Sequence, residues 1–437
     1  MKRALLLLVG CIAIFASLGL FRRPQPPPAG KTAIEFWTYA GGGSAARSTR
    51  FWRGVADGFE KDNPDIKVGV VADINQGHFL GMLTTRLLGG HAPDVIVADD
   101  GVIAALNQDG LLAPLDSYIQ ADKVYRQSDF PPSMVGDGYV GDTCYSIPWY
   151  GGYGGLFYRA DLFQKAGVVP PRTWEELLAV CKTLQDKLGM KYPLAIEPQG
   201  AFWMWAWMWQ NGGDVLSPDC RKITIDTPEV IGAVQFVHDL VHTYRVCDPA
   251  LTKGTPVSEL WSSGKAAMMI DGSWAIGLLD DSYPAYKGKW KLVPLPAGKF
   301  RFGFYGGQHM AIPKDSRHRD LAWRFMAYAT TPLVQKAWSD QTGSPPSNLR
   351  TFELPGFADD HPHLVAMKEA MLAGRNNPLV PFIGELWYGR FADLVLDPVM
   401  PRADADVADI ARSASAQLQS TVDDYWRTHK HFVQGRR

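Results

Sequence analysis

The runs AIEFW (33–37), IKVGVV (66–71) and PDVIVA (93–98) are three short apolar segments near the start of a chain of 437 residues. Each run has the length and the β-branched or aromatic content of a strand. Apolar residues at helical spacing fill the two intervals, at 48–62 and 79–88. Strand, helix, strand, helix and strand at this spacing predict an α/β fold with a largely parallel sheet.

Polar and aromatic side chains stand where the first and third of these strands end. Trp37 and Tyr39 precede a glycine loop, and Asp99 and Asp100 follow the third run. Ligands of such sheets bind beyond the carboxyl ends of the strands. Because a carboxylate can accept two hydroxyls and an aromatic ring offers a flat apolar face, we expect these four residues to contact a ligand. One of the two aspartates is also explained as the N-cap of the next helix.

A second α/β region follows, so the chain is expected to form two domains or one large one. Residues 173–188 begin with a capping box and residues 227–244 begin with Thr-Pro, and both patterns predict helices. Residues 266–270 and 306–312 are strand-like, and the last third of the chain is mainly helical.

The segment FWMWAWMW at 202–209 holds four of the fifteen tryptophans. An indole plate complements the apolar C–H face of a sugar ring, and it carries one hydrogen-bond donor at its edge. Most tryptophans, however, are packing residues, and in a helix Trp203 and Trp207 would share one face while the other two lie opposite. We expect at most two of the four to touch a ligand, and we select Trp203 and Trp205.

The composition argues against several classes of protein. Apolar residues make up 46% and charged residues 20%, a balance typical of a globular protein rather than a disordered one. The net charge is −1 and no basic stripe is visible, which argues against nucleic acid as a partner. The chain has no Cys-x-x-Cys and no His-rich metal spacing, so we expect neither a metal nor a cofactor.

Residues 1–30 have the pattern of an export signal or anchor, followed by a proline-rich tether. Two basic residues precede an apolar run at 4–21, which is also just long enough to span a bilayer. Three outcomes stay open, namely lipidation at Cys11, cleavage within 16–19, or retention as a membrane anchor. All three place the folded part in the periplasm or otherwise outside the cytoplasm.

Four cysteines follow the leader, and they are Cys144, Cys181, Cys220 and Cys247. An even count permits disulfides in an oxidising compartment. Cys220 and Cys247 bracket a strand-like segment and a helix, so we expect them to pair.

Six segments carry a family resemblance when they are taken in order. They read AIEFWTY, FEKDNPDIKV, APDVIVAD with GLLAPLDSYI, YSIPWYGGYGGLFYRADLFQKAGVVPPRTWEELLAVCKTL, GKAAMMIDGSWAIG and GGQHMAIPKDSRHRDLAWRFMAYATTPLVQKAWSDQTGSPPSN. The set resembles the extracellular solute-binding proteins, family 1, of ATP-driven (ABC-type) importers, in the carbohydrate branch with maltose-, multiple-sugar- and glycerol-3-phosphate-binding members. Single pieces are weak, but the ordered set covers nearly everything from Lys31 onward and is specific to the family.

The resemblance implies a two-lobe periplasmic-binding-protein-like fold of type II, in which each lobe is a mainly parallel sheet flanked by helices. The expected boundaries are 31–149 plus 306–344 for lobe 1 and 150–305 plus 345–437 for lobe 2. The expected hinge crossings are 148–152, 304–307 and 343–348, each rich in Gly, Pro or Ser.

The resemblance also implies ligand contacts at these crossings and at one position facing the cleft. The implied contacts are Tyr150, Tyr153, Trp274, Gly306, Gly307 and Gln308. Arg390 is ambiguous: glycerol-phosphate binders of the family hold phosphate with an arginine in the C-terminal region, whereas an arginine on an amphipathic helix usually lies in solvent or in a surface ion pair.

The function that the resemblance implies is non-enzymatic capture of a sugar or related polyol. A monomeric binding protein would deliver this ligand to the transmembrane subunits of an ABC permease. Two alternatives stay open. Trp-rich clefts and carboxylate pairs also describe secreted glycoside hydrolases, although no recognisable catalytic pair or nucleophile motif is present. An uncleaved N-terminal helix would instead suit a signalling or adhesion ectodomain.

Overall fold

The computed structural model describes residues 30–39, 45–250, 257–380 and 382–428. The expected leader, with Cys11 and nearly all of the tether, lies outside these ranges. Among the described helices, none combines the length and the apolar character that a membrane crossing requires.

One sheet of nine strands runs through the described part of the chain, in the order β2-β1-β3-β10-β6-β8-β7, with β9 beside β6 and β11 beside β10. The strands are β1 (Thr32–Tyr39), β2 (Ile66–Ile74), β3 (Val95–Asp99), β6 (Ser146–Arg159), β7 (Leu194–Ala195), β8 (Met268–Gly272), β9 (Trp290–Pro294), β10 (Gly303–Ala311) and β11 (Gly374–Arg375). A separate small pair consists of β4 (Tyr139–Val140) and β5 (Thr143–Cys144).

The sheet is mixed, and the reason lies in the path of the chain. The three runs identified in the sequence are β1, β2 and β3, and β1 is parallel to both of its neighbours. β7 and β8 are parallel as well. β6 carries the chain out of one lobe and β10 carries it back, so these two strands pair antiparallel with each other. The expectation of a mainly parallel sheet therefore holds for β1, β2 and β3 of the left lobe. It is wrong for the right lobe, where β8 and β9 both run antiparallel to β6 and the parallel pairing of β7 with β8 spans two residue pairs.

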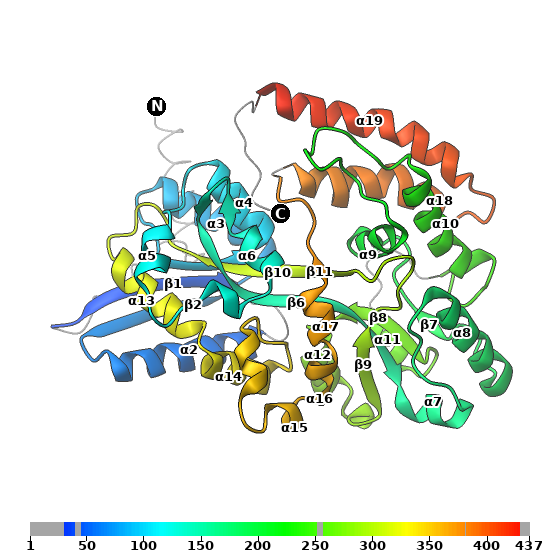
Figure 1. The fold of residues 1–437 in the computed structure, drawn as a ribbon, viewed down its shortest axis with the longest axis horizontal. Coiled ribbons are helices and arrows are strands. Elements are labelled where there is room, and N and C mark those ends of the chain that lie inside the picture. The colour runs from blue at the N-terminus through cyan, green and yellow to red at the C-terminus, as the bar shows by residue number, and fades with distance from the viewer. Residues whose placement is uncertain (1–29, 40–44, 251–256, 381, 429–437) are drawn as a thin grey trace, which may run out of the picture.

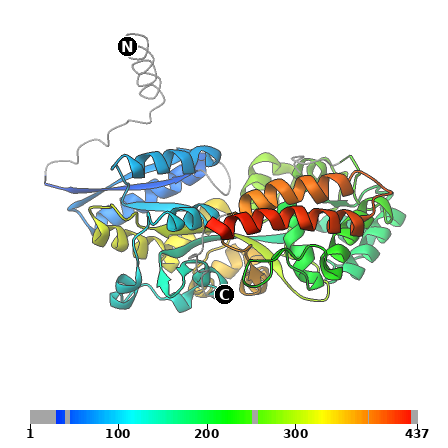
Figure 2. The ribbon, with the colours of Figure 1, turned by 90° about the horizontal axis from the view of Figure 1, so that it is seen from above.

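Figure 1 shows two lobes side by side, with β6 and β10 running across both. Helices around β1 to β3 build the left lobe: α2 (Ala45–Asp62), α3 (Gln76–Leu88), α4 (Asp100–Gln108), α13 (Arg319–Ala329) and α14 (Pro332–Thr342). Others build the right lobe: α7 (Ala160–Ala166), α8 (Trp174–Leu188), α9 (Ala201–Asn211), α10 (Pro228–His242), α11 (Val257–Ser262), the π-helix η4 (Gly384–Leu396), α18 (Asp397–Val399) and α19 (Val407–Thr428). Figure 2 shows η4 and α19 lying beside each other.

Short helices complete the chain. They are α5 (Asp116–Ala121), η1 (Gln127–Asp129), α6 (Pro132–Asp137), α12 (Ala275–Ser282), η2 (Pro284–Tyr286), η3 (Leu349–Glu353), α15 (Phe357–Asp360), α16 (Pro362–Ala366) and α17 (Lys368–Leu372). The capping signal read in the sequence is present, because Thr173 Oγ1 accepts a hydrogen bond from the Glu176 amide at 3.2 Å at the start of α8.

The tryptophan-rich segment forms helix α9, and most of its rings belong to the core. Trp205 is fully buried, with its ring 4.2 Å from that of Trp387 and 5.2 Å from that of Trp209. Trp207 packs on the opposite side, beside Trp174. Helical periodicity thus sends successive indoles to different neighbours, as expected for a helix rather than a strand.

The expected Cys220–Cys247 disulfide is wrong, because all four described cysteines are buried thiols. Burial raises the pKa of the Cys247 thiol, and the neighbouring Cys181 adds to this, so Cys247 faces helix α8. Cys220 lies instead in a turn whose carbonyl accepts the Trp426 indole N–H at 2.8 Å. Positions that bracket a helix in the sequence need not direct their side chains toward each other.

Trp205→Ala is expected to lower the free energy of unfolding by about 3–5 kcal/mol, because it leaves a large cavity among closely packed rings. Trp205→Phe is the matched variant. It keeps an aromatic ring and removes an indole N–H that has no hydrogen-bond partner among the described residues, so it should cost much less. Chemical denaturation of both variants measures the difference, and equal losses would contradict the packing described.

Candidate functional site

The antiparallel pair β6 and β10 has two faces at the point where it passes between the lobes. Gly152 pairs with Gly306 and Tyr150 with Gln308. Side chains alternate along a strand, and directly paired residues share a face. Face A carries Tyr150, Gly152, Gly154, Phe304, Gly306 and Gln308. Face B carries Gly151, Tyr153, Gly155, Tyr305, Gly307 and His309.

Three aromatic rings of the right lobe lie against face A. Phe202 and Trp203 come from the first turn of α9, and Trp274 immediately precedes α12. The rings of Trp203 and Trp274 are nearly parallel, at 28° with centroids 5.8 Å apart. Phe202 stands at 83° to the first and 74° to the second. Phe202 and Trp274 are only partly buried, so ring surface remains accessible beside the crossing strands.

Glycines on face A make this close approach possible. A Cβ on Gly152 would lie 2.5 Å from the Trp274 ring, and one on Gly154 would lie 3.1 Å from the Trp203 ring. A Cβ on Gly306 would lie 3.7 Å from Phe202. The absence of side chains lets indole rings and strand backbone come together, and it leaves backbone amides close to anything that binds there.

The left lobe contributes a directed chain of hydrogen bonds to the same face. Gln308 Nε2 donates to the Tyr39 hydroxyl at 2.7 Å, and that hydroxyl in turn donates to Asp99 Oδ1. Gln76, the first residue of α3, donates from Nε2 to Asp99 Oδ2 at 2.8 Å. Tyr39 ends β1 and Asp99 ends β3, so the expected meeting of these strand ends is what brings the two residues together.

Burial shifts the pKa of a carboxyl group at a strand end in each lobe. Burial raises the pKa of Asp99, although hydrogen bonds from Tyr39, Gln76 and Gln308 oppose the rise. Asp271 stands at the carboxyl end of β8, where burial raises its pKa to about 6 against the hydrogen bonds from the Gly272 amide and Trp274. Asp99 pairs with Gln308 of face A and ends a strand where ligands of α/β sheets bind, whereas Asp271 pairs with Gly155 of face B.

Face B carries a second polar cluster, which joins the left lobe to the segment after β11. Asp100 Oδ2 accepts from the Gly307 amide at 2.9 Å and from Asn376 Nδ2 at 2.5 Å. The same amide nitrogen of Asn376 lies 3.2 Å from Asp137 Oδ2, which also accepts from the Tyr305 hydroxyl. One amide group thus bridges two carboxyls.

The face B acids hold their protons unusually well. Burial, and then the charge of Asp99, raises the pKa of Asp100 to about 7. Burial, and then the charge of Asp100, raises the pKa of Asp137 to about 7. His309 is affected in the opposite sense, because burial lowers its pKa to about 4 and keeps the ring neutral at neutral pH.

Ser146, His309 and Asp100 follow one another in the order of a nucleophile, a base and an acid. Ser146 Oγ lies 3.0 Å from His309 Nδ1, and His309 Nε2 lies 3.4 Å from Asp100 Oδ1 without forming a hydrogen bond. Ser146 and His309 are both 1% exposed, so the hydroxyl is out of reach of a substrate. The arrangement is a buried structural contact rather than a catalytic relay.

The residues selected from the sequence divide into three groups. Those brought together at face A are Tyr39, Asp99, Tyr150, Trp203, Trp274, Gly306 and Gln308. Those placed at face B are Asp100, Tyr153 and Gly307. Asp99 occupies the N-cap position of α4 but makes no capping hydrogen bond with its side chain.

Trp37, Trp205 and Arg390 lie apart from both faces. The Trp37 indole donates to Glu35 Oε1 at 2.6 Å, and the Arg86 guanidinium covers its ring at 4.8 Å. Trp205 belongs to the core of the right lobe. Arg390 donates to the Thr421 hydroxyl, which ties η4 to α19. In each case, a neighbouring residue already contacts the side chain that we expected to bind a ligand.

Sequence reasoning missed Gln76, Asp137, Asn376 and Phe202. Phe202 was within reach, since it opens the tryptophan-rich segment. Asn376 comes from a stretch more than 230 residues after Asp137, and no local pattern distinguishes it. Among the described residues, no cluster of three or more His, Cys, Asp or Glu is arranged to hold a metal ion.

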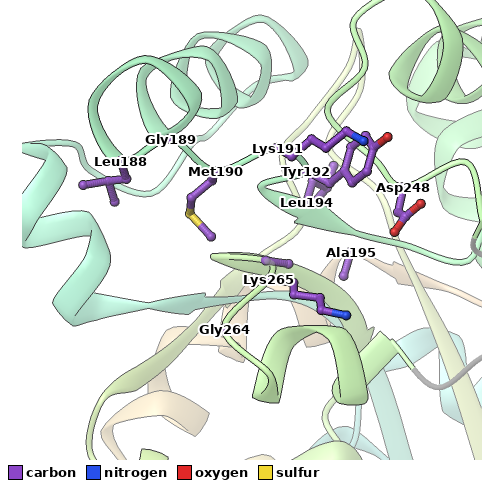
Figure 3. A pocket seen from close by; sticks show the side chains of 11 residues that line it. Leu188, Gly189, Met190, Lys191, Tyr192, Leu194, Ala195, Asp248, Gly264 and Lys265 are labelled. Atoms are coloured by element: carbon purple, nitrogen blue, oxygen red, sulfur yellow. The ribbon is translucent and has the colours of Figure 1, made fainter.

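A separate cavity of about 440 Å³ lies in the right lobe, as Figure 3 shows. Its wall comes from the end of α8, the segment leading into β7, and the segment before β8. Lys191, Tyr192, Asp248 and Lys265 line it. No residue selected from the sequence takes part, so this cavity is distinct from face A.

Comparison with known proteins gives concordant results. The sequence profile described as bacterial extracellular solute-binding protein matches residues 43–336, two thirds of the chain. An arabinooligosaccharide-binding protein of Halalkalibacterium halodurans is 25% identical over 357 residues, covering 76% of this chain and 75% of that protein. A maltotriose-binding protein of Pyrococcus abyssi is 24% identical over 330 residues, covering 72% and 68%. The sugar-binding protein MalE of Xanthomonas citri shares the fold, with a TM-score of 0.82 at 22% identity over 92% of this chain and all of that one.

The free energy of unfolding of the Asp137→Asn variant is expected to rise with pH relative to that of the unsubstituted protein. The folded pKa of Asp137 is about 7 and an unfolded aspartate titrates near 4, so the folded state binds the extra proton between these values. The unsubstituted protein therefore loses up to about 1.4 kcal/mol per pH unit there, and the Asn variant does not. Denaturant unfolding from pH 4 to 8 measures this difference, and a difference that stays constant would contradict the burial of Asp137.

Proposed function

The chain belongs to the bacterial extracellular solute-binding proteins, and from this membership we propose that it captures a sugar or related polyol between its two lobes. The ligand is then handed, chemically unchanged, to the membrane permease of an ATP-driven importer. The family consists of binding proteins rather than enzymes, so the glycoside hydrolase alternative gains no support.

One observation carries the proposal. Face A combines accessible aromatic rings from one lobe with a fixed chain of hydrogen-bonding groups from the other, and side-chain-free backbone lies between them. An aromatic plate matches the apolar face of a sugar ring, and a carboxylate matches its hydroxyl rim. Relatives named for arabino-oligosaccharides and maltotriose support a saccharide as the ligand.

The proposed binding residues follow from this geometry. Trp274, Trp203 and Phe202 stack against the ligand, and Asp99 and Gln308 hydrogen-bond to it. Tyr39 holds Asp99 in position, because its hydroxyl already donates to Asp99 and accepts from Gln308.

The proposed mechanism is a shift between open and closed lobes. We place lobe 1 at 31–149 plus 306–344 and lobe 2 at 150–305 plus 345–437, so that β6, β10 and residues 343–348 form the hinge. A ligand that touches both lobes stabilises the closed form through contacts that the open form lacks. Affinity in the micromolar range corresponds to about 8 kcal/mol, which a few stacked rings and charge-assisted hydrogen bonds can supply.

The protein acts outside the cytoplasm, as the family does. We propose that residues 1–30 direct this export, and the mass of the mature N-terminus would separate cleavage, lipidation and anchoring. Both sides of face A come from one chain, so a monomer suffices. The permease is the proposed macromolecular partner.

Isothermal titration against mono-, di- and trisaccharides and polyols tests the proposal directly. We expect at least one, with arabinotriose and maltotriose as the first probes, to bind with a dissociation constant in the micromolar range. If no neutral, cationic or anionic saccharide or polyol shows binding, the proposed function is refuted.

Trp274→Ala and Asp99→Ala should each weaken binding at least tenfold, about 1–3 kcal/mol, because one removes a stacking surface and the other a charged acceptor. Trp290→Phe is the control. Trp290 lies on β9 beside Phe157, away from face A, so this variant should bind the ligand with the original affinity. Unchanged affinity in both test variants would show that the ligand binds away from face A.

A further inference from the structure

We propose that Asn376, Asp100 and Asp137 form a latch between the two lobes, and that closing this latch takes a proton from solvent onto the pair of acids. The three are positioning residues, because they contact one another rather than the ligand and set how readily the cleft closes on it. The inference rests on the proposed capture of a sugar or polyol between the lobes, and it adds a control of that capture by pH.

The latch lies where two strands end beside β10. β3 pairs antiparallel with β10 at Gln308–Ala311, and β11 pairs parallel with it at Gly303–Phe304. Because of these opposite directions, the carboxyl ends of β3 and β11 face each other across the short stretch 305–307. Asp100 follows β3 in the left lobe, and Asn376 follows β11 in the segment that we assign to lobe 2. A contact between these two residues therefore joins the lobes.

One amide group holds two carboxyls. Asn376 Nδ2 donates to Asp100 Oδ2 at 2.5 Å and to Asp137 Oδ2 at 3.2 Å. Asp137 ends α6 in the left lobe and also accepts from the Tyr305 hydroxyl. Opening the lobes would carry Asn376 away from both acids, so these hydrogen bonds belong to the closed form. Asp100 is only 5% exposed, whereas Asp137 and Asn376 are half-buried, which gives solvent protons access to the pair.

Among the described residues, no lysine or arginine forms an ion pair with Asp100 or Asp137. His309 Nε2 lies 3.4 Å from Asp100 Oδ1, but burial lowers the pKa of His309 to about 4 and leaves the ring neutral. Arg375 pairs with Phe304 on face A, and its guanidinium lies 3.1 Å from Asp214. The other titratable groups that face the pair are Asp99, Tyr39, Tyr153 and Tyr305.

Two carboxylates beside one nitrogen atom repel each other, so the closed pair holds a proton that separated carboxylates would release. Burial, followed by the charge of a neighbouring aspartate, raises the pKa of Asp100 and of Asp137 to about 7. In the open form water reaches both acids, and a solvated aspartate titrates at about 4. Closure therefore takes up a proton between these values, and the affinity for a ligand falls as the pH rises through this interval.

Isothermal titration with maltotriose, or with arabinotriose if that binds more tightly, measures this linkage. We expect the affinity to fall by about tenfold or more from pH 5 to pH 7. Titrations at pH 6 in buffers of different ionisation enthalpy should show that the protein takes up about half a proton or more for each ligand bound. A merely structural contact would not produce this proton uptake.

The double variant Asp100→Asn, Asp137→Asn imitates the protonated pair, since each amide oxygen can still accept from Asn376. Its affinity should change less than threefold between pH 5 and pH 7, and at pH 7 it should bind more tightly than the unsubstituted protein. Asp281→Asn is the matched control, because Asp281 also pairs across the lobes, with Arg47, but at an exposed position. The control should keep the full pH dependence, and a double variant that keeps it as well would overturn the inference.

Asn376→Ala tests the bridge itself. It removes both hydrogen bonds of the closed latch, so binding at pH 5 should weaken at least threefold. Asn377→Ala is the matched control, because the Asn377 side chain donates to the carbonyl of the adjacent Pro378 at 3.4 Å and should leave the affinity unchanged. Equal affinities in the two variants would overturn the role of Asn376.

Small-angle X-ray scattering of the ligand-free protein separates this inference from the proposed function, because it needs no saccharide. The radius of gyration should rise from pH 5 to pH 8 in the unsubstituted protein and stay at the lower value in the double variant. A radius that does not change with pH in the unsubstituted protein would overturn the latch. A radius that does change, without binding of any saccharide or polyol, would refute the proposed function and leave the latch standing.

Discussion

The close antiparallel pairing of β6 with β10 is the constraint on which the rest of the structure depends. These strands connect the two lobes, and on face A they need positions without side chains where the aromatic rings of the right lobe approach them. Gly152 opposite Gly306 meets this requirement, since a Cβ on Gly152 would collide with the Trp274 ring. Without these glycines, the aromatic rings of one lobe could not lie next to the polar strand ends of the other.

The same pair of strands separates two chemistries. Face A is partly open and gathers groups suited to a ligand, whereas face B is packed and gathers groups suited to holding the lobes in register. Asp99 and Asp100 are adjacent in the sequence but serve opposite faces, because one ends β3 and the other begins α4. Asn376 completes face B by bridging Asp100 and Asp137, which links the segment after β11 to the left lobe.

Much of the fold could be predicted, because it depends on local patterns. The strands at 33–37, 66–71 and 93–98 are recognisable from length and apolar content, and Thr173 caps α8 as its side chain suggests. The site could be predicted only in part. Tyr39 and Asp99 follow from the rule that strand ends meet. Trp37 is also an aromatic residue near the end of β1, but its ring lies under Arg86 instead. The distinction depends on a helix that packs there from elsewhere in the chain.

The sequence by itself determined the α/β class, the family, and a supply of aromatic and acidic residues at strand ends, since periodicity and ordered motifs are properties of neighbouring residues. The tertiary structure decided which of those residues share a face. Trp203 and Trp205 are two positions apart on one helix, yet one lies beside Trp274 and the other packs in the core against Trp387. Their spacing places the two rings on opposite sides of a helix, but long-range packing decides which side meets the crossing strands and which side meets the core.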